Sequence, residues 1–258
     1  MDADELFQAA LECRKLAYTW NDEGLYVVQL SDVTATISLG NIRRNYERDG
    51  DAEAVERFVQ RLDTDVFAHC PPWDDAARHV RYSLEPSDYA TGFDDTLHEA
   101  VTEDLARVFV LTPPDGSRIS WITHDMVAKW GVRAEDVVAL THANMERLVG
   151  AATLDAQEID GVTLGMLALE NAPFKASLIL SSQFRRLVSS VHGWPVLVVA
   201  PARDFVYVLA TVDRQFLNRL RGIVLREYQE SGHPITADVL EVGDHGIMPI
   251  GSFAARDN

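Results

Sequence analysis

The sequence contains little lysine, little cysteine and no long apolar run. Three of its 258 residues are lysine, which fits either a high-GC genome or a salt-adapted proteome with acidic protein surfaces. Cys13 and Cys70 are too few for a disulfide framework and fit a reducing compartment. The longest apolar stretch, residues 194–200, is interrupted by Pro195 and is far shorter than the roughly 20 residues of a membrane-spanning helix. The N-terminus is acidic and lacks the basic segment followed by an apolar run that is typical of a signal peptide. We therefore expect a cytoplasmic protein without a membrane segment.

Motifs for nucleotides, metals and nucleophilic catalysis are also missing. The sequence has no GxxxxGK[ST] or GxGxxG stretch and no CxxC, HxxxH or HExxH spacing. Four of its eight histidines stand beside an acidic residue or cysteine, and adjacent side chains on a helix or strand point apart. Ser177 lies between alanine and leucine without a GxSxG elbow, so we interpret it as a packing residue. We therefore expect no metal site and no cofactor.

Negative charge dominates the sequence and is concentrated toward the N-terminus. Forty acidic and 23 basic residues give a formal net charge of −17, and 23 of the acidic residues but only 9 of the basic ones precede residue 105. Such a field repels nucleic acid and anionic membranes and attracts basic partners. The alternative is that the acidity only maintains solubility.

Residues 85–104 are the most negative stretch, with seven acidic side chains and no basic one. We expect this stretch to be a solvated loop with a short helix. Its carboxylates are our candidates for contact with a basic protein partner: Glu85, Asp88, Asp94, Asp95, Glu99, Glu103 and Asp104.

Hydrophobic periodicity predicts hairpins interleaved with amphipathic helices, which indicates an α+β fold with antiparallel hairpins or a mixed sheet. An Asp-Gly turn at 160–161 between two apolar runs predicts a hairpin. The expected helices cover 4–18, 39–48, 52–62, 123–129, 133–149, 184–191 and 213–228, and the expected strands 25–30, 79–84, 105–111, 118–122, 152–158, 162–169, 195–200, 205–211 and 238–242. The charge distribution suggests a helix-rich acidic part, 1–104, and an α+β part, 105–258, or else one continuous domain.

Three stretches, taken in order, resemble a known family. They are VTATISLGNIRRNY at 33–46, Trp130-Gly131 with a following helix that ends in Ala143-Asn144-Met145, and the pair ASLIL at 176–180 and VAPARD at 199–204. Together they resemble the YtpQ-like family of uncharacterised bacterial proteins, a domain of unknown function. The resemblance implies a compact bacterial domain, and it carries over no catalytic residue.

Two polar groups are candidates for binding an anion. Arg203 and Asp204 lie at the tip of a predicted hairpin, where a guanidinium fork can bind a carboxylate or phosphate. The alternative is that Asp204 closes the turn and Arg203 makes a local ion pair. Asn41 and Tyr46 stand at a predicted helix start, where backbone N–H groups bind anions, although an asparagine there more often caps its own helix and a tyrosine packs.

Three functions are compatible with these observations. The favoured one is a non-catalytic acidic protein that binds a basic protein partner, of the adaptor or the immunity or regulatory type. The second is an enzyme of unrecognised class, with an anion-binding pocket where Arg203 and Asp204 converge with Asn41 and Tyr46. The third is a structural homodimer.

Overall fold

The computed structural model divides the chain into two compact units, Met1–Pro71 and Pro72–Asn258, and each unit is described by itself. The structure describes residues 2–20, 24–30, 34–40, 42–43, 46, 50–64, 70–89, 93–113, 119–169 and 174–254. Within this part of the chain no helix is both long and apolar enough to cross a membrane. Helices and antiparallel strands occur in both units, which confirms the predicted α+β fold.

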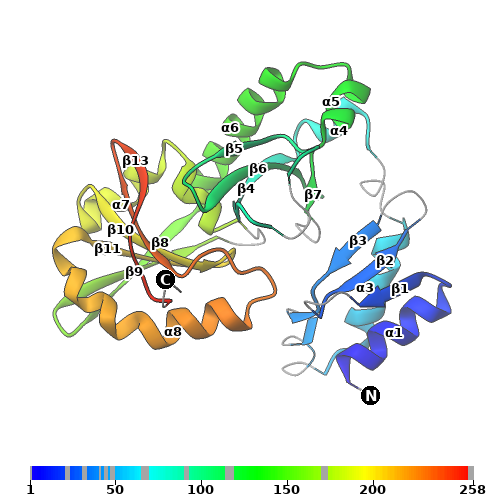
Figure 1. Ribbon diagram of the computed structural model, residues 1–258, viewed down its shortest axis with the longest axis horizontal. Helices are drawn as coiled ribbons and strands as arrows, with labels where there is room; N and C mark the ends of the chain where they lie inside the picture. Colours follow the sequence, from blue (N-terminus) through cyan, green and yellow to red (C-terminus); the bar gives the residue numbers. More distant parts are fainter. Residues whose placement is uncertain are drawn as a thin grey trace. The chain divides into compact units, whose positions relative to one another are not determined.

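The first unit combines a three-stranded antiparallel sheet with two long helices (Figure 1). Its elements are α1 (Ala3–Cys13), β1 (Ala17–Trp20), β2 (Tyr26–Gln29), β3 (Thr34–Ile37) and α3 (Ala52–Thr64). The core joins Phe7 of α1, Val28 of β2 and Val59 of α3, which are all fully buried. The helix predicted over 4–18 ends earlier than expected because Lys15 takes a left-handed conformation, with φ of 57°, and a strand begins two residues later.

The larger sheet of the second unit has six antiparallel strands in the order β13-β12-β10-β11-β9-β8. These strands are β8 (Thr153–Ile159), β9 (Val162–Ala168), β10 (Val196–Ala202), β11 (Phe205–Ala210), β12 (Asp238–Gly243) and β13 (Gly246–Ser252). The predicted β8–β9 hairpin is confirmed, and its two turn residues, Asp160 and Gly161, both have positive φ, as a type I′ turn requires.

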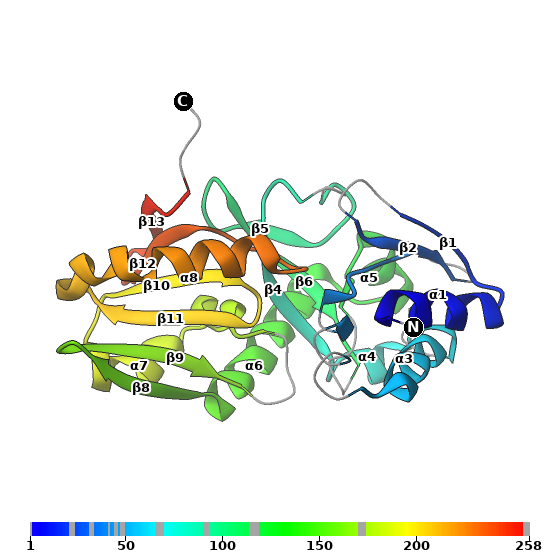
Figure 2. The same ribbon diagram turned by 90° about the horizontal axis from the view of Figure 1, so that it is seen from below.

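Helices cover both faces of this sheet. Helix α8 (Leu217–Glu230), preceded by the short helix η3 (Thr211–Phe216), packs on β10 (Figure 2). Helix α7 (Phe184–His192) contacts β8 and β11. Alternate residues of β11 face the two layers, since Tyr207 belongs to the core cluster under α8 whereas its neighbour Val208 does not.

The smaller sheet of the second unit is built around β6 (Leu105–Leu111). Strand β4 (Val80–Pro86) pairs along one side of β6, and β5 (His98–Ala100) and β7 (Ser120–Trp121) pair along the other. The helical elements of this part are α4 (Trp73–Ala76), α5 (His124–Trp130), α6 (Ala134–Ala151) and η2 (Ala176–Leu180). As predicted, Thr123 caps α5, with its Oγ1 accepting from the Met126 N–H at 3.2 Å.

Other expectations about the chain also differ from the structure. Residues 85–104 contain strand β5 and the end of β4, and no helix among the residues described there, because β6 offers hydrogen-bonding groups on both edges. Since β4 and β5 pair with β6, residues 72–104 share a unit with the residues that follow, and the division lies after Pro71 rather than after 104. Strand β13 was not expected, because Pro249 and two glycines are uncommon in strands.

Candidate functional site

Arg203 lies at the tip of the β10–β11 hairpin, as predicted, but its side chain is buried. The guanidinium is 7% exposed, and its Nε and Nη2 both donate to Oε1 of Glu85, at 3.0 and 2.6 Å. Glu85 lies on β4, so this ion pair joins the large sheet to the small one. A carboxylate or phosphate from outside would have to compete with Glu85 for the fork.

Backbone contacts and a neutral imidazole surround this ion pair. The Arg203 C=O accepts from the Ala176 N–H at 2.9 Å, and the Arg203 N–H donates to the His233 C=O at 3.4 Å. Burial and the positive charge of Arg203 lower the pKa of His233 to about 3, and its Nδ1 is buried with no hydrogen-bond partner in the described part of the chain. His233 is therefore neutral at physiological pH, and Glu85 is the countercharge of Arg203.

The other predicted anion-binding residues lie in different parts of the chain. Asp204 is exposed at the hairpin tip, and Asn41 lies outside the described residues. Tyr46 belongs to the first unit, where it packs against the core cluster, as expected of a structural tyrosine. The convergence of these residues in one pocket stays a prediction.

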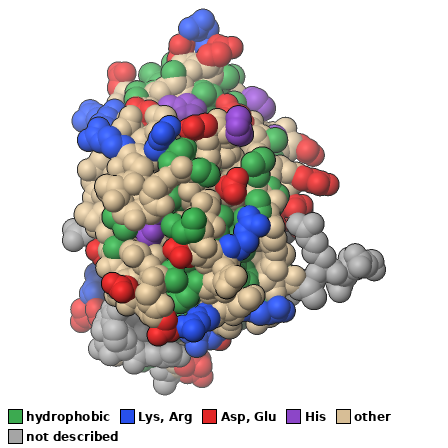
Figure 3. All heavy atoms as spheres, turned by 90° about the vertical axis from the view of Figure 1, so that its left-hand side faces the viewer, with side chains coloured by type: hydrophobic (Ala, Val, Ile, Leu, Met, Phe, Trp, Pro, Cys, Tyr) green, Lys and Arg blue, Asp and Glu red, His purple; other side chains and the backbone are tan. Residues whose placement is uncertain are grey.

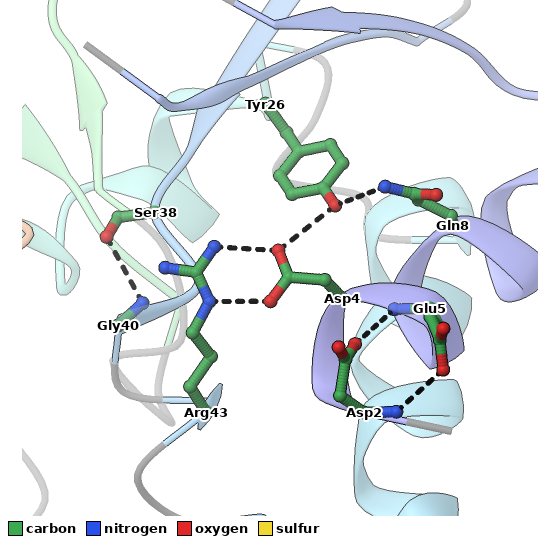
Figure 4. A network of polar contacts seen from close by, with 8 residues as sticks. All are labelled: Asp2, Asp4, Glu5, Gln8, Tyr26, Ser38, Gly40 and Arg43. Carbon is green, nitrogen blue, oxygen red and sulfur yellow. Dashed lines mark hydrogen bonds and ion pairs between the residues drawn. The ribbon is translucent and has the colours of Figure 1, made fainter.

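Arg43, which lies between Asn41 and Tyr46 in the sequence, is engaged by a carboxylate of its own unit (Figure 4). Its Nε and Nη2 donate to the two Asp4 oxygens at 2.6 and 2.7 Å, and the Tyr26 hydroxyl donates to Asp4 at 3.2 Å. The hydrogen bond from Arg43 lowers the pKa of Asp4, and burial raises the pKa of Tyr26 to about 12. This network links α1 to the chain after β3, so the fork of Arg43 already holds an anion.

The seven acidic candidates divide into one buried residue and six exposed ones. Glu85 is 1% exposed, so the interpretation of this residue as a partner contact was wrong; β4 extends two residues further than predicted and carries Glu85 into the interior. The exposed six are Asp88, Asp94, Asp95, Glu99, Glu103 and Asp104.

Backbone hydrogen bonds bring these exposed carboxylates together at the two ends of β5. At one end, the Ser87 N–H donates to the Asp104 C=O at 3.0 Å, which places Asp88 beside Asp104. At the other end, the His124 N–H donates to the Asp95 C=O at 3.0 Å, which brings the exposed Asp125 close to Asp95. We call Asp88, Asp94, Asp95, Glu99, Glu103, Asp104 and Asp125 the acidic surface. Asp125 was missed because the sequence does not reveal that the start of α5 meets residue 95.

One cation is paired within the acidic surface. Arg107 on β6 donates to Glu99 at 2.5 Å, and its guanidinium lies 5.1 Å from the centre of the Tyr82 ring. No other ion pair to the acidic surface occurs among the described side chains. By contrast, the face of the second unit seen in Figure 3 has side chains of both signs interspersed with hydrophobic ones.

A polar cluster that the sequence did not reveal lies between β4, β6 and α6. The rings of Tyr82 and His142 are 5.5 Å apart, and Arg107 lies beside Tyr82. Burial raises the pKa of Tyr82 to about 12, while burial and then the charge of Arg107 lower the pKa of His142. Both rings are therefore neutral near pH 7, and the cluster adds no positive charge beyond Arg107 to the edge of the acidic surface.

Comparison of the chain with protein-family models, with curated proteins and with solved structures finds no match in any of the three. The resemblance to the YtpQ-like family stays a prediction. Among the side chains that the structure describes, no three histidine, cysteine, aspartate or glutamate residues gather in a way that could hold a metal ion.

Proposed function

We propose that this chain is a non-catalytic protein that binds a basic protein partner through its acidic surface, as an adaptor or an immunity or regulatory protein does. The supporting observation is the exposure of all seven carboxylates of that surface, of which only Glu99 has an ion-pair partner among the described residues. Exposed carboxylates without cationic neighbours create a negative potential that steers a basic partner during encounter and gives the association a steep salt dependence.

The arrangement favours a partner with two groups of basic residues. Asp88, Glu103 and Asp104 lie at one end of β5, and Asp94, Asp95 and Asp125 lie at the other, with Glu99 between them. In the Arg107–Glu99 pair the Glu99 side chain is 43% exposed, so a cation of the partner can reach and share this carboxylate.

The alternative proposal, an enzyme of unrecognised class, is weakened by the surroundings of Arg203. It needs a guanidinium that is free to bind a substrate anion, and that of Arg203 is buried against Glu85. The other alternative, a homodimer, concerns a different surface.

The test compares a site variant with a control variant of equal charge. The site variant carries Asp88→Asn, Glu103→Gln and Asp104→Asn, and the control carries Glu56→Gln, Glu135→Gln and Glu230→Gln, which are also exposed. Each protein is used to capture partners from a bacterial lysate at low salt. A basic protein retained by the wild type and by the control is then purified for affinity measurements across a salt series.

The expected result is that the site variant binds this protein at least about tenfold more weakly, with a shallower salt dependence, while the control is nearly unchanged. Equal losses in both variants would mean that net charge alone drives the association, and the proposal of a specific surface would then be rejected.

A further inference from the structure

Strand β8 forms one outer edge of the six-stranded sheet, and none of the described residues covers this edge. β8 pairs with β9 along all seven of its residues, from Thr153 opposite Ala168 to Ile159 opposite Val162. Six of its seven residues are exposed. In the described part of the chain, no backbone hydrogen bond reaches the side of β8 that faces away from β9.

The other strand edges of the second unit are protected in recognisable ways. At the opposite edge of the large sheet, β13 contains Pro249, and its pairing with β12 shifts register between Val239 and Leu240; both features hinder pairing with a further strand. On the outer edge of β4, the Leu84 N–H donates to Ser177 Oγ at 3.0 Å, and the Val80 C=O accepts from Asn144 Nδ2 at 3.0 Å. β5 and β7 have only three and two residues. β8 is long and regular and contains no proline or glycine.

The hairpin fixes which backbone groups of β8 face outward. A two-residue type I′ turn makes the residues that flank it, Ile159 and Val162, a hydrogen-bonded pair. Hydrogen bonds to β9 then alternate along the strand. The N–H and C=O groups of Leu154, Ala156 and Glu158 therefore point away from the sheet, and these three residues present a regular ladder at its edge.

We propose that β8 pairs with the same strand of a second copy of this chain, antiparallel and centred on Ala156, so that two six-stranded sheets become one. A twofold interface requires a surface that is complementary to itself, and this register provides it. Leu154 then lies opposite Glu158 of the partner subunit, and Asp155 opposite Gln157 of the partner subunit. In this register no two carboxylates stand directly opposite each other; a like-charge pair of that kind would be destabilising.

The same register places favourable groups at the centre and at the ends. The small side chain of Ala156 lies at the twofold axis, directly opposite Ala156 of the partner subunit. Ile159, which is 37% exposed, lies opposite Thr153 of the partner subunit, and β-branched pairs of this kind stabilise antiparallel strands. The interface goes beyond the proposed function, since it uses none of the residues of the acidic surface.

Salt distinguishes the two surfaces. Asp155 and Glu158 bring four carboxylates into the dimer, so screening by salt is expected to strengthen dimerisation, whereas it weakens the binding of a basic partner. Failure of one proposal is therefore distinguishable from failure of the other.

The experiment is sedimentation velocity of the full chain from about 1 to 200 µM, at low and at high salt. The wild type is expected to dimerise, and Ala156→Glu, which sets two carboxylates against each other at the axis, is expected to weaken the dimer at least about tenfold. Ala143→Glu, on the exposed face of α6, is the control and is expected to have no effect. Gln157→Lys, which places an ammonium opposite Asp155 of the partner subunit, is expected to strengthen the dimer several-fold.

A wild type that is monomeric at the highest concentration in both salts overturns the proposal. A dimer that Ala156→Glu leaves intact, with unchanged circular dichroism, overturns it as well, because the two copies would then meet through another surface.

Discussion

Gly165 on β9 leaves the space in which the imidazole of His192 lies. A Cβ added at Gly165 would be 2.5 Å from His192 Nε2 and 2.9 Å from Cδ1 of Leu154. His192 is the last residue of α7 and is buried, and neither ring nitrogen has a hydrogen-bond partner among the described residues. The absence of a side chain on β9 therefore sets how closely α7 packs on this face of the sheet.

Gly165→Ala is expected to destabilise the second unit by about 1–3 kcal/mol, because the buried imidazole must move out of a close-packed position. The measurement is the midpoint of urea unfolding. Gly150→Ala is the control: Gly150 lies in α6, where a Cβ would meet nothing within 4 Å, and the substitution is expected to be neutral or to stabilise by up to about 1 kcal/mol. If the double variant Gly165→Ala/His192→Ala is no less destabilised than the sum of its two single variants, the steric explanation is wrong.

The ion pair between Glu85 and Arg203 gives a second prediction. Glu85→Gln leaves the guanidinium buried without a countercharge and is expected to cost about 3–5 kcal/mol of the free energy of unfolding. The double variant Glu85→Leu/Arg203→Met removes both charges and is expected to be much closer to the wild type. Guanidinium chloride unfolding of Glu85→Leu, Arg203→Met and the double variant measures the coupling.

This cycle also separates two interpretations of Arg203. A structural pair gives a large coupling energy, with the double variant folded and still able to bind its partner. If Glu85→Gln is instead nearly neutral and Arg203→Met impairs binding, Arg203 serves an external anion and the structural interpretation is rejected.

Local features of the fold could be predicted because their causes are close together in the sequence. The Asp160-Gly161 turn predicts the β8–β9 hairpin because both positions tolerate positive φ, and Thr123 predicts the start of α5 because its hydroxyl can cap the nearby Met126 N–H. Strand β13 could not be predicted in this way, since Pro249 is tolerated only because the strand lies at a sheet edge.

The candidate site shows the same limit. The exposure of Asp94 and Glu103 could be predicted, because the stretch that contains them has no apolar residues at regular spacing. The burial of Glu85 depends on Arg203, which lies 118 residues further along the chain, and nothing near Glu85 in the sequence indicates such a partner. The place of Asp125 in the acidic surface depends in the same way on a backbone contact with Asp95.

The third prediction concerns pH. The pKa of His233 is about 3 in the folded chain, because burial and Arg203 disfavour its charged form, against about 6.5 in an unfolded chain. Between these two values the unfolded chain binds more protons than the folded one, so stability must fall as the pH falls below about 6.5. His233 alone is expected to cost about 2 kcal/mol between pH 6.5 and pH 5.

The measurement is the free energy of urea unfolding from pH 7.5 to pH 4.5, for the wild type and for His233→Gln. His79, His142 and His192 also have lowered pKa values. The slope of the unfolding free energy against pH is therefore expected to correspond to more than one proton in the wild type, and His233→Gln is expected to reduce it by about one proton. His245→Gln, which removes an exposed histidine at the β12–β13 turn, is the matched control. An equal slope in the wild type and in His233→Gln would mean that His233 is not held neutral beside Arg203, and that the environment of the buried ion pair is more polar than its geometry implies.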